Sequence, residues 1–99
     1  MKFSLRFTPT SEEDLRILKN SLNLAKRYNA VTKALQFLES NPHHPSLQTH
    51  PYYSLIGPHG EKVFEAYAEQ DTPAAYRIFF YYSTQKRGEI VVFAITPHP

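Results

Sequence analysis

The sequence contains no cysteine. Disulfide bonds, thiolate metal sites and a cysteine nucleophile are therefore excluded, and the absence favours a reducing compartment. No apolar stretch approaches the ~20 residues that a membrane-spanning helix needs. The amino terminus also lacks the long apolar region of a signal peptide. Without a membrane span or a signal peptide, we expect a cytoplasmic protein with no membrane association. Repeats, low-complexity segments and linkers are missing as well.

The chain has little excess charge of either sign. Lys and Arg number 11 against 9 Asp and Glu, a net charge of +2, which permits a nucleic-acid or acidic partner without requiring one. The length of 99 residues predicts a single domain spanning 1–99. The five histidines and seven tyrosines are more unusual, because they provide groups that exchange protons near neutral pH or stack on bases.

Hydrophobic periodicity predicts an α+β fold that begins with a strand and a two-helix hairpin. Apolar and polar residues alternate over 2–8, which is typical of a half-buried strand. Thr10 to Glu13 has the form of a capping box and predicts a first helix over about 11–21. A second helix is predicted over about 23–40, ended by Pro42. Its apolar stripe consists of Leu24, Tyr28, Val31, Leu35 and Leu38.

The second half predicts four strands of a curved antiparallel sheet. The predicted strands are 52–56, 62–68, 75–82 and 89–95. Turn-forming residues at 57–60, at 70–73 and at 83–88 separate them. The order is therefore β-α-α-β-β-β-β, in which strands follow helices in blocks, as in the α+β class.

Arg77 and His98 are the first candidates for chemistry. The guanidinium of Arg77 would bind a phosphate with two hydrogen bonds, or it pairs with Glu65 on the neighbouring predicted strand. His98 follows the last strand directly. Histidine is the side chain best suited to move a proton at neutral pH, although one so near the end of a chain is often only a polar tail.

Three more histidines, His43, His44 and His50, crowd the proline-rich loop 41–51. Histidine is a common zinc ligand, but these spacings match no standard zinc pattern and no cysteine is available. We therefore predict no metal site and no cofactor. His50 stands just before a strand, where it could face the sheet.

Aromatic residues are dense along 62–68 and 75–82. Successive side chains of a strand point to opposite faces, so one set packs under the helices. The other set, with Tyr81, is half-exposed and could stack on bases, although packing is the alternative use. Lys86 and Arg87 add a basic tip between the last two strands. The cations Lys26, Arg27 and Lys33 of the second helix form either a solvated face or a nucleic-acid contact.

Four segments of the second half resemble the RelE/ParE superfamily of toxins, the mRNA-interferase-like toxins of type II toxin–antitoxin systems. They are HPSLQTHPYYSLIG (44–57), KVFEAYA (62–68), AYRIFFYY (75–82) and EIVVFAITPH (89–98). The similarity in sequence starts at residue 44, and the order of elements agrees over nearly the whole chain.

This resemblance implies a two-helix hairpin on a curved antiparallel sheet and an antitoxin protein as partner. It also implies a metal-independent endoribonuclease that acts on messenger RNA at the ribosome, where a ribose 2′-OH attacks the adjacent phosphate. By position, Arg77 matches a phosphate-binding arginine and His98 a histidine that serves as general acid or base. His50 matches a histidine of the loop before the sheet.

Two positions depart from the pattern of several such toxins, which have lysine or arginine where this chain has Glu65 and Tyr67. A carboxylate facing the phosphate would repel it.

Three hypotheses about function follow from the sequence. The first is an endoribonuclease whose catalytic residues are His98, Arg77 and His50. The second is a catalytically silent member that only binds protein in the groove between helices and sheet, and the third is a ParE-type gyrase inhibitor. The predicted nucleic-acid contacts are Arg77, Lys86, Arg87 and Tyr81.

Overall fold

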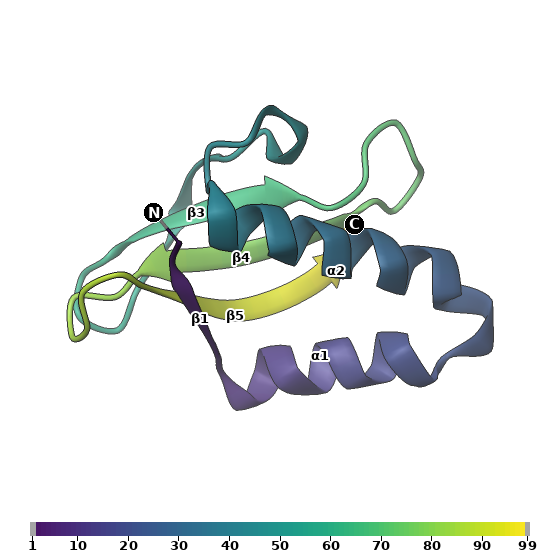
Figure 1. Ribbon diagram of the computed structural model, residues 1–99, viewed down its shortest axis with the longest axis horizontal. Coiled ribbons are helices and arrows are strands. Elements are labelled where there is room, and N and C mark those ends of the chain that lie inside the picture. The colour runs from purple at the N-terminus through teal and green to yellow at the C-terminus, as the bar shows by residue number, and fades with distance from the viewer. Residues whose placement is uncertain (1, 99) are drawn as a thin grey trace.

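The computed structural model describes residues 2–98 and confirms the predicted order of elements, with the helices on one side of a sheet (Figure 1). The helices are α1 (Pro9–Asn20) and α2 (Ala25–Ser40), with short 3₁₀ turns at Leu22–Leu24 and Pro45–Leu47. The strands are β1 (Ser4–Phe7), β2 (His50–Ile56), β3 (Lys62–Tyr67), β4 (Tyr76–Tyr82) and β5 (Glu89–Pro97).

The sheet has five strands in the order β1-β5-β4-β3-β2. The last four strands form the predicted antiparallel series, in which each strand pairs with the next along the chain. β1 pairs with β5 in parallel, from Ser4 opposite Glu89 to Phe7 opposite Val92, so the sheet is mixed. A parallel pair needs a crossover connection, and the helical hairpin begins it here.

α1 begins earlier than its predicted capping box. Thr8 is the N-cap, since its hydroxyl oxygen accepts a hydrogen bond from the Ser11 N–H at 3.3 Å, and Pro9 occupies the first helical position. The capping box predicted for Thr10 to Glu13 is therefore wrong. Proline suits the first turn because its missing N–H would have no partner there.

The helical hairpin buries its apolar side against one face of the sheet. Of the predicted stripe on α2, Val31, Leu35 and Leu38 are buried and the other two members are partly buried. The sheet residues that complete this core are Ala66, Ile78, Phe80, Ile90, Val92 and Ile95. The opposite face of the sheet carries no helix (Figure 1).

Aromatic residues on the helix-free face are more buried than expected. Phe79 is 5% exposed and Tyr81 is 7% exposed, whereas the alternation predicted a half-exposed set. The ring of Tyr52 in β2 meets Phe79 edge-on at 4.9 Å, so the β2–β3 hairpin covers part of this face. Register irregularities in β2 and between β4 and β5 allow the strands to bend in this way.

Candidate functional site

The helix-free face brings three charged or titratable side chains together on adjacent strands. His50 in β2 pairs with Glu65 in β3, and Tyr67 of β3 pairs with Arg77 in β4. Phe64 and Ala66 belong to the core, and by strand alternation Glu65 points to the opposite side. Two of the predicted catalytic residues, His50 and Arg77, therefore meet at Glu65.

Glu65 is the centre of this group. One of its oxygens, Oε1, lies 2.7 Å from Nε2 of His50, and the other, Oε2, accepts a hydrogen bond from Nη1 of Arg77 at 2.7 Å. The side chains are 5% exposed for Glu65 and 12% for Arg77, so their ion pair is largely removed from water. The predicted pairing of Arg77 with Glu65 is confirmed.

Arg77 has further donor capacity. Its guanidinium carbon lies 4.8 Å from the centre of the Phe79 ring, so the cation is stacked on an aromatic face. Its Nε is buried and, within residues 2–98, has no hydrogen-bond partner. A buried donor without a partner is uncommon and is a candidate contact for a ligand oxygen.

The ring of His50 is held at both nitrogens. Nδ1 lies 2.8 Å from the carbonyl oxygen of Gln48 and Nε2 faces Glu65. Gln48 has a left-handed backbone with φ of 47°, which is uncommon for a residue other than glycine. The side chain of His50 remains 43% exposed, so part of its ring borders solvent.

His98 lies at the same end of the sheet. Thr96, two residues earlier, pairs with Arg77 across β4 and β5. The backbone N–H of His98 donates a hydrogen bond to the Ala75 carbonyl at 2.8 Å, which continues the pairing beyond the strand. His98 is exposed. Its role as general acid or base stays a prediction.

The other predicted nucleic-acid contacts lie elsewhere on the sheet. Lys86 and Arg87 are exposed in the loop between β4 and β5, next to Tyr82. Tyr82 lies five positions along the extended strand from Arg77, a distance of about 17 Å. Tyr81 lies on the same strand between them and exposes only 7% of its surface. The structure therefore does not bring Lys86, Arg87 or Tyr81 together with the cluster of His50, Glu65 and Arg77.

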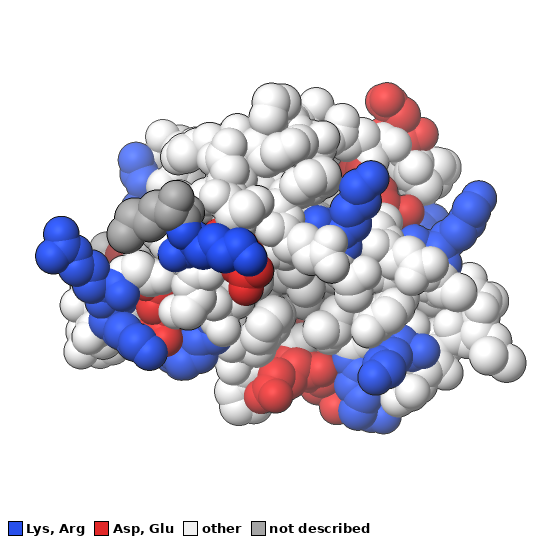
Figure 2. Space-filling view, viewed as in Figure 1, with Lys and Arg blue, Asp and Glu red and all other residues white. Residues whose placement is uncertain are grey.

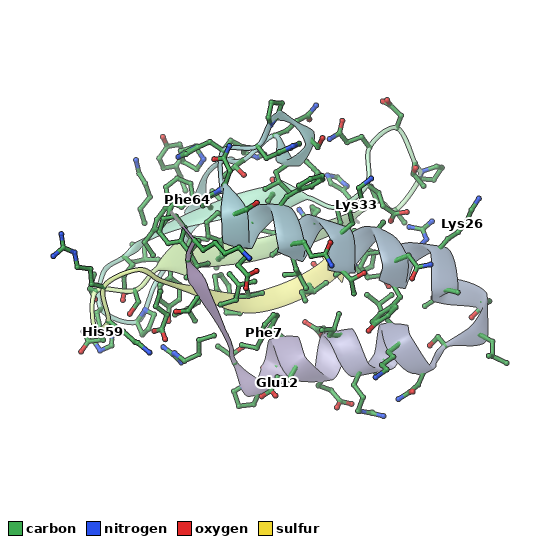
Figure 3. All side chains as sticks on the ribbon, viewed as in Figure 1. Phe7, Glu12, Lys26, Lys33, His59 and Phe64 are labelled. Carbon is green, nitrogen blue, oxygen red and sulfur yellow. The ribbon has the colours of Figure 1, made fainter. Side chains whose placement is uncertain are left out.

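The cations of α2 differ in their surroundings. Arg27 pairs with Glu69 at 3.1 Å, and the exposed Lys33 lies 5.8 Å from the centre of the Phe37 ring. Lys26 is exposed near the start of the helix, at the opposite end of the molecule from His59 of the β2–β3 turn (Figure 3). On the face shown in Figure 2, Lys and Arg are spread out with acidic residues between them. This face therefore shows no single concentrated basic surface.

Of the two remaining loop histidines, His43 is exposed and His44 has structural contacts. His44 stacks on Phe37 with 3.9 Å between ring centres, and its Nδ1 accepts a hydrogen bond from the Ser46 N–H. Across residues 2–98, no three His, Asp or Glu side chains are grouped closely enough to hold a metal ion. No helix in the same range is long and apolar enough to cross a membrane.

Sequence reasoning missed the central position of Glu65 and a second buried carboxylate. In the sequence Glu65 is a departure from the toxin pattern, and its predicted pairing with Arg77 is the signal that points to its role. Glu61, whose side chain is 3% exposed, accepts hydrogen bonds from the His59 N–H and the Thr84 hydroxyl. No local spacing in the sequence indicated that second group.

A hollow borders the helices at the edge of the sheet. It has a volume of about 460 Å³ and lies between α2 and the segment that leads into β2. Ala34 and Phe37 line it on the helix side, while Leu47 and Tyr67 line it on the other. The lining is mixed, since Lys33, Ser46 and Gln70 also border the hollow. A hollow of this kind beside a helix could receive side chains of another protein.

Comparison with known proteins supports the fold. No family model matches the chain, and no curated protein matches its sequence. Among solved structures, the YoeB dimer from Staphylococcus aureus superposes with a TM-score of 0.70 over 100% of both chains, at 11% sequence identity. YoeB has the fold of the RelE toxins. The chain therefore has the RelE/ParE-like fold that its second half predicts.

Proposed function

We propose that this chain is the toxin of a toxin–antitoxin system and that it cleaves messenger RNA without a metal ion. The observation that carries the proposal is the contact of Arg77 and His50 with one buried carboxylate, 2.7 Å from each, on the helix-free face of a RelE/ParE-like sheet. The likeness to YoeB supports the toxin assignment. The proposal includes an antitoxin protein as partner, cleavage at the ribosome and a cytoplasmic location.

The chemistry requires three contributions. A base removes the proton of the ribose 2′-OH, the oxygen attacks phosphorus, and an acid protonates the departing 5′-oxygen. Cationic donors stabilise the extra negative charge on phosphorus in the transition state. Arg77 is assigned the phosphate, since its Nε is a donor that the protein does not use. His98, at the same end of the sheet, is assigned a proton transfer.

Regulated expression in bacteria tests this function. We expect the wild type to arrest growth and to cut messenger RNA in the presence of ribosomes and EDTA. Arg77→Ala and His98→Ala are expected to lower cleavage by about a hundredfold or more, because each removes a transition-state interaction. Arg16→Ala is the matched control, since Arg16 is exposed and pairs with the exposed Glu13 on α1. A wild type that neither arrests growth nor cleaves RNA with ribosomes present excludes the enzyme.

A second candidate function is protein binding without catalysis. Glu65 already accepts a hydrogen bond from Arg77 in this structure, and the hollow beside α2 offers a mixed polar and apolar surface that includes Phe37. In that case the wild type would leave RNA intact but bind the product of a small acidic reading frame beside its gene. Substitution of Phe37 by Ala would weaken that binding, whereas Arg77→Ala would not.

A further inference from the structure

The protons of the His50 ring follow from its two contacts. Nδ1 lies 2.8 Å from the Gln48 carbonyl oxygen. A carbonyl oxygen only accepts hydrogen bonds, so Nδ1 carries a proton. Nε2 lies 2.7 Å from Oε1 of Glu65, and this contact also requires a proton between the two atoms. The pair therefore holds one shared proton in addition to the one on Nδ1.

The shared proton belongs either to the imidazole or to the carboxyl group. The groups that face this contact are the Gln48 carbonyl, the Tyr67 ring 5.7 Å from the imidazole, and Arg77 on the far side of Glu65. Oε2 of Glu65 accepts a hydrogen bond from the permanently charged Arg77 at 2.7 Å, the geometry of a cation attracted to a carboxylate anion. Because Glu65 is nearly buried, water weakens this attraction little.

We propose that Glu65 is a positioning residue that holds His50 in the doubly protonated form and fixes Arg77 beside it. Two cations bridged by one carboxylate then present one net positive charge on the helix-free face. A histidine that donates from both nitrogens has no lone pair to accept the 2′-OH proton. His50 therefore supplies charge to the site, and the role of proton acceptor falls to another group, for which His98 is the predicted residue.

The protonation of His50 can be measured without any activity. In ¹⁵N-labelled protein at pH 7, the ring-nitrogen shifts of His50 are expected to show a proton on both nitrogens, with signals assigned by their loss in His50→Gln. In Glu65→Gln we expect a neutral ring with its proton on Nδ1, because the negative charge is gone. Glu39→Gln, at a partly exposed ion pair with Lys2, is the control. A wild-type ring with one bare nitrogen overturns the proposal, even if Glu65→Gln does not fold.

The catalytic consequence rests on the proposed function and needs a pH profile of RNA cleavage. His50→Gln keeps an N–H donor toward Glu65 but removes the charge. We expect this variant to lower kcat by about a hundredfold at every pH from about 5.5 to 8. The part of the pH profile in which kcat rises with pH, its rising limb, should remain. His98→Ala is expected to lose that limb. Loss of the limb in His50→Gln would mean that His50 accepts the proton, contrary to the proposal. If the wild type cleaves no RNA, the proposed function fails while the ring-nitrogen result still stands.

Discussion

At the scale of single residues, two nearly buried glutamates, Glu61 just before β3 and Glu65 within it, make different kinds of contact. Glu65 contacts two cationic partners, His50 and Arg77. Glu61 accepts hydrogen bonds from the His59 N–H in the β2–β3 turn and from the Thr84 hydroxyl in the β4–β5 loop, so it links these two segments. Its neighbour Gly57 has to lack a side chain, because a Cβ there would lie 2.5 Å from the Glu61 carboxylate.

The stability of the protein should depend on the ionisation of Glu61. Burial disfavours the charged carboxylate, but hydrogen bonds from its own and the His59 N–H, from Thr84 and from the His59 ring outweigh burial and hold the pKa of Glu61 below its ordinary value of 4.5. The unfolded chain then binds the proton more readily than the folded protein does. This contribution is fully present above about pH 4.5 and is lost as the pH falls through the lower pKa of the folded state.

Urea unfolding of the wild type and of Glu61→Gln at pH 6 and at pH 3 measures this effect. The wild type is expected to have a larger advantage in the free energy of unfolding at pH 6 than at pH 3. Glu12→Gln, on the exposed side of α1, controls for the loss of one charge. An advantage that is equal at both pH values would contradict the assignment.

At the scale of elements, Arg27 joins the start of α2 to the loop between β3 and β4. Its Nη1 donates to the Ala74 carbonyl at 2.7 Å and to Glu69, and its Nη2 donates to the Pro73 carbonyl at 3.1 Å. The same loop has left-handed backbone at Asp71 and Ala74, with φ of 56° and 55°. Arg27 is therefore a structural clamp on a strained loop, whereas its place off the apolar stripe had suggested a solvated face or a nucleic-acid contact.

Loss of the clamp should loosen the loop and leave the sheet intact. In Arg27→Ala we expect amide hydrogens of residues 69–76 to exchange roughly tenfold faster, since several hydrogen bonds to a charged group are removed. The amides of Ile78 and Phe80 in the core should not change. Lys26→Ala, the exposed neighbour on the same helix, should have no effect. Equal protection of the loop in both variants would show that Arg27 does not restrain it.

At the scale of the whole molecule, the N-terminal part of the chain is held by the last strand. β1 pairs with β5, the hydroxyl of Ser11 in α1 donates to the Val92 carbonyl at 2.7 Å, and Asp14 accepts the Ile95 N–H at 3.0 Å. The helices and the sheet therefore share contacts from both ends of the chain. We expect them to unfold together.

Leu18→Ala tests this coupling. Leu18 is 1% exposed in the core between α1 and the sheet, so its truncation should lower the free energy of unfolding by about 2–5 kcal/mol. Transitions followed by helix circular dichroism and by tyrosine fluorescence should remain coincident. Ile17→Ala, one position earlier and 49% exposed, should cost much less. A helix signal that melts before the tyrosine signal would disprove the coupling.

The type and order of the elements followed from the sequence alone, because the periodicity of strands and helices is local. The stripe on α2 and the end of that helix before Pro42 were predicted in this way. The start of α1 was not, since two threonines flank Pro9 and only the packed helix selected Thr8 as its cap. The predicted pairing of Arg77 with Glu65 was also available from the sequence, because both lie on adjacent predicted strands.

Only the tertiary structure decided what surrounds these residues. It placed β1 in parallel beside β5, buried Phe79 and Tyr81 on the helix-free face, and brought His50 to the carboxylate that already binds Arg77. The physical reason is distance along the chain. His50 and Glu65 are 15 residues apart, and strand register and sheet curvature, not local spacing, determine that their side chains touch. For that reason Glu65, a departure from the toxin pattern in the sequence, became the centre of the candidate site in the fold.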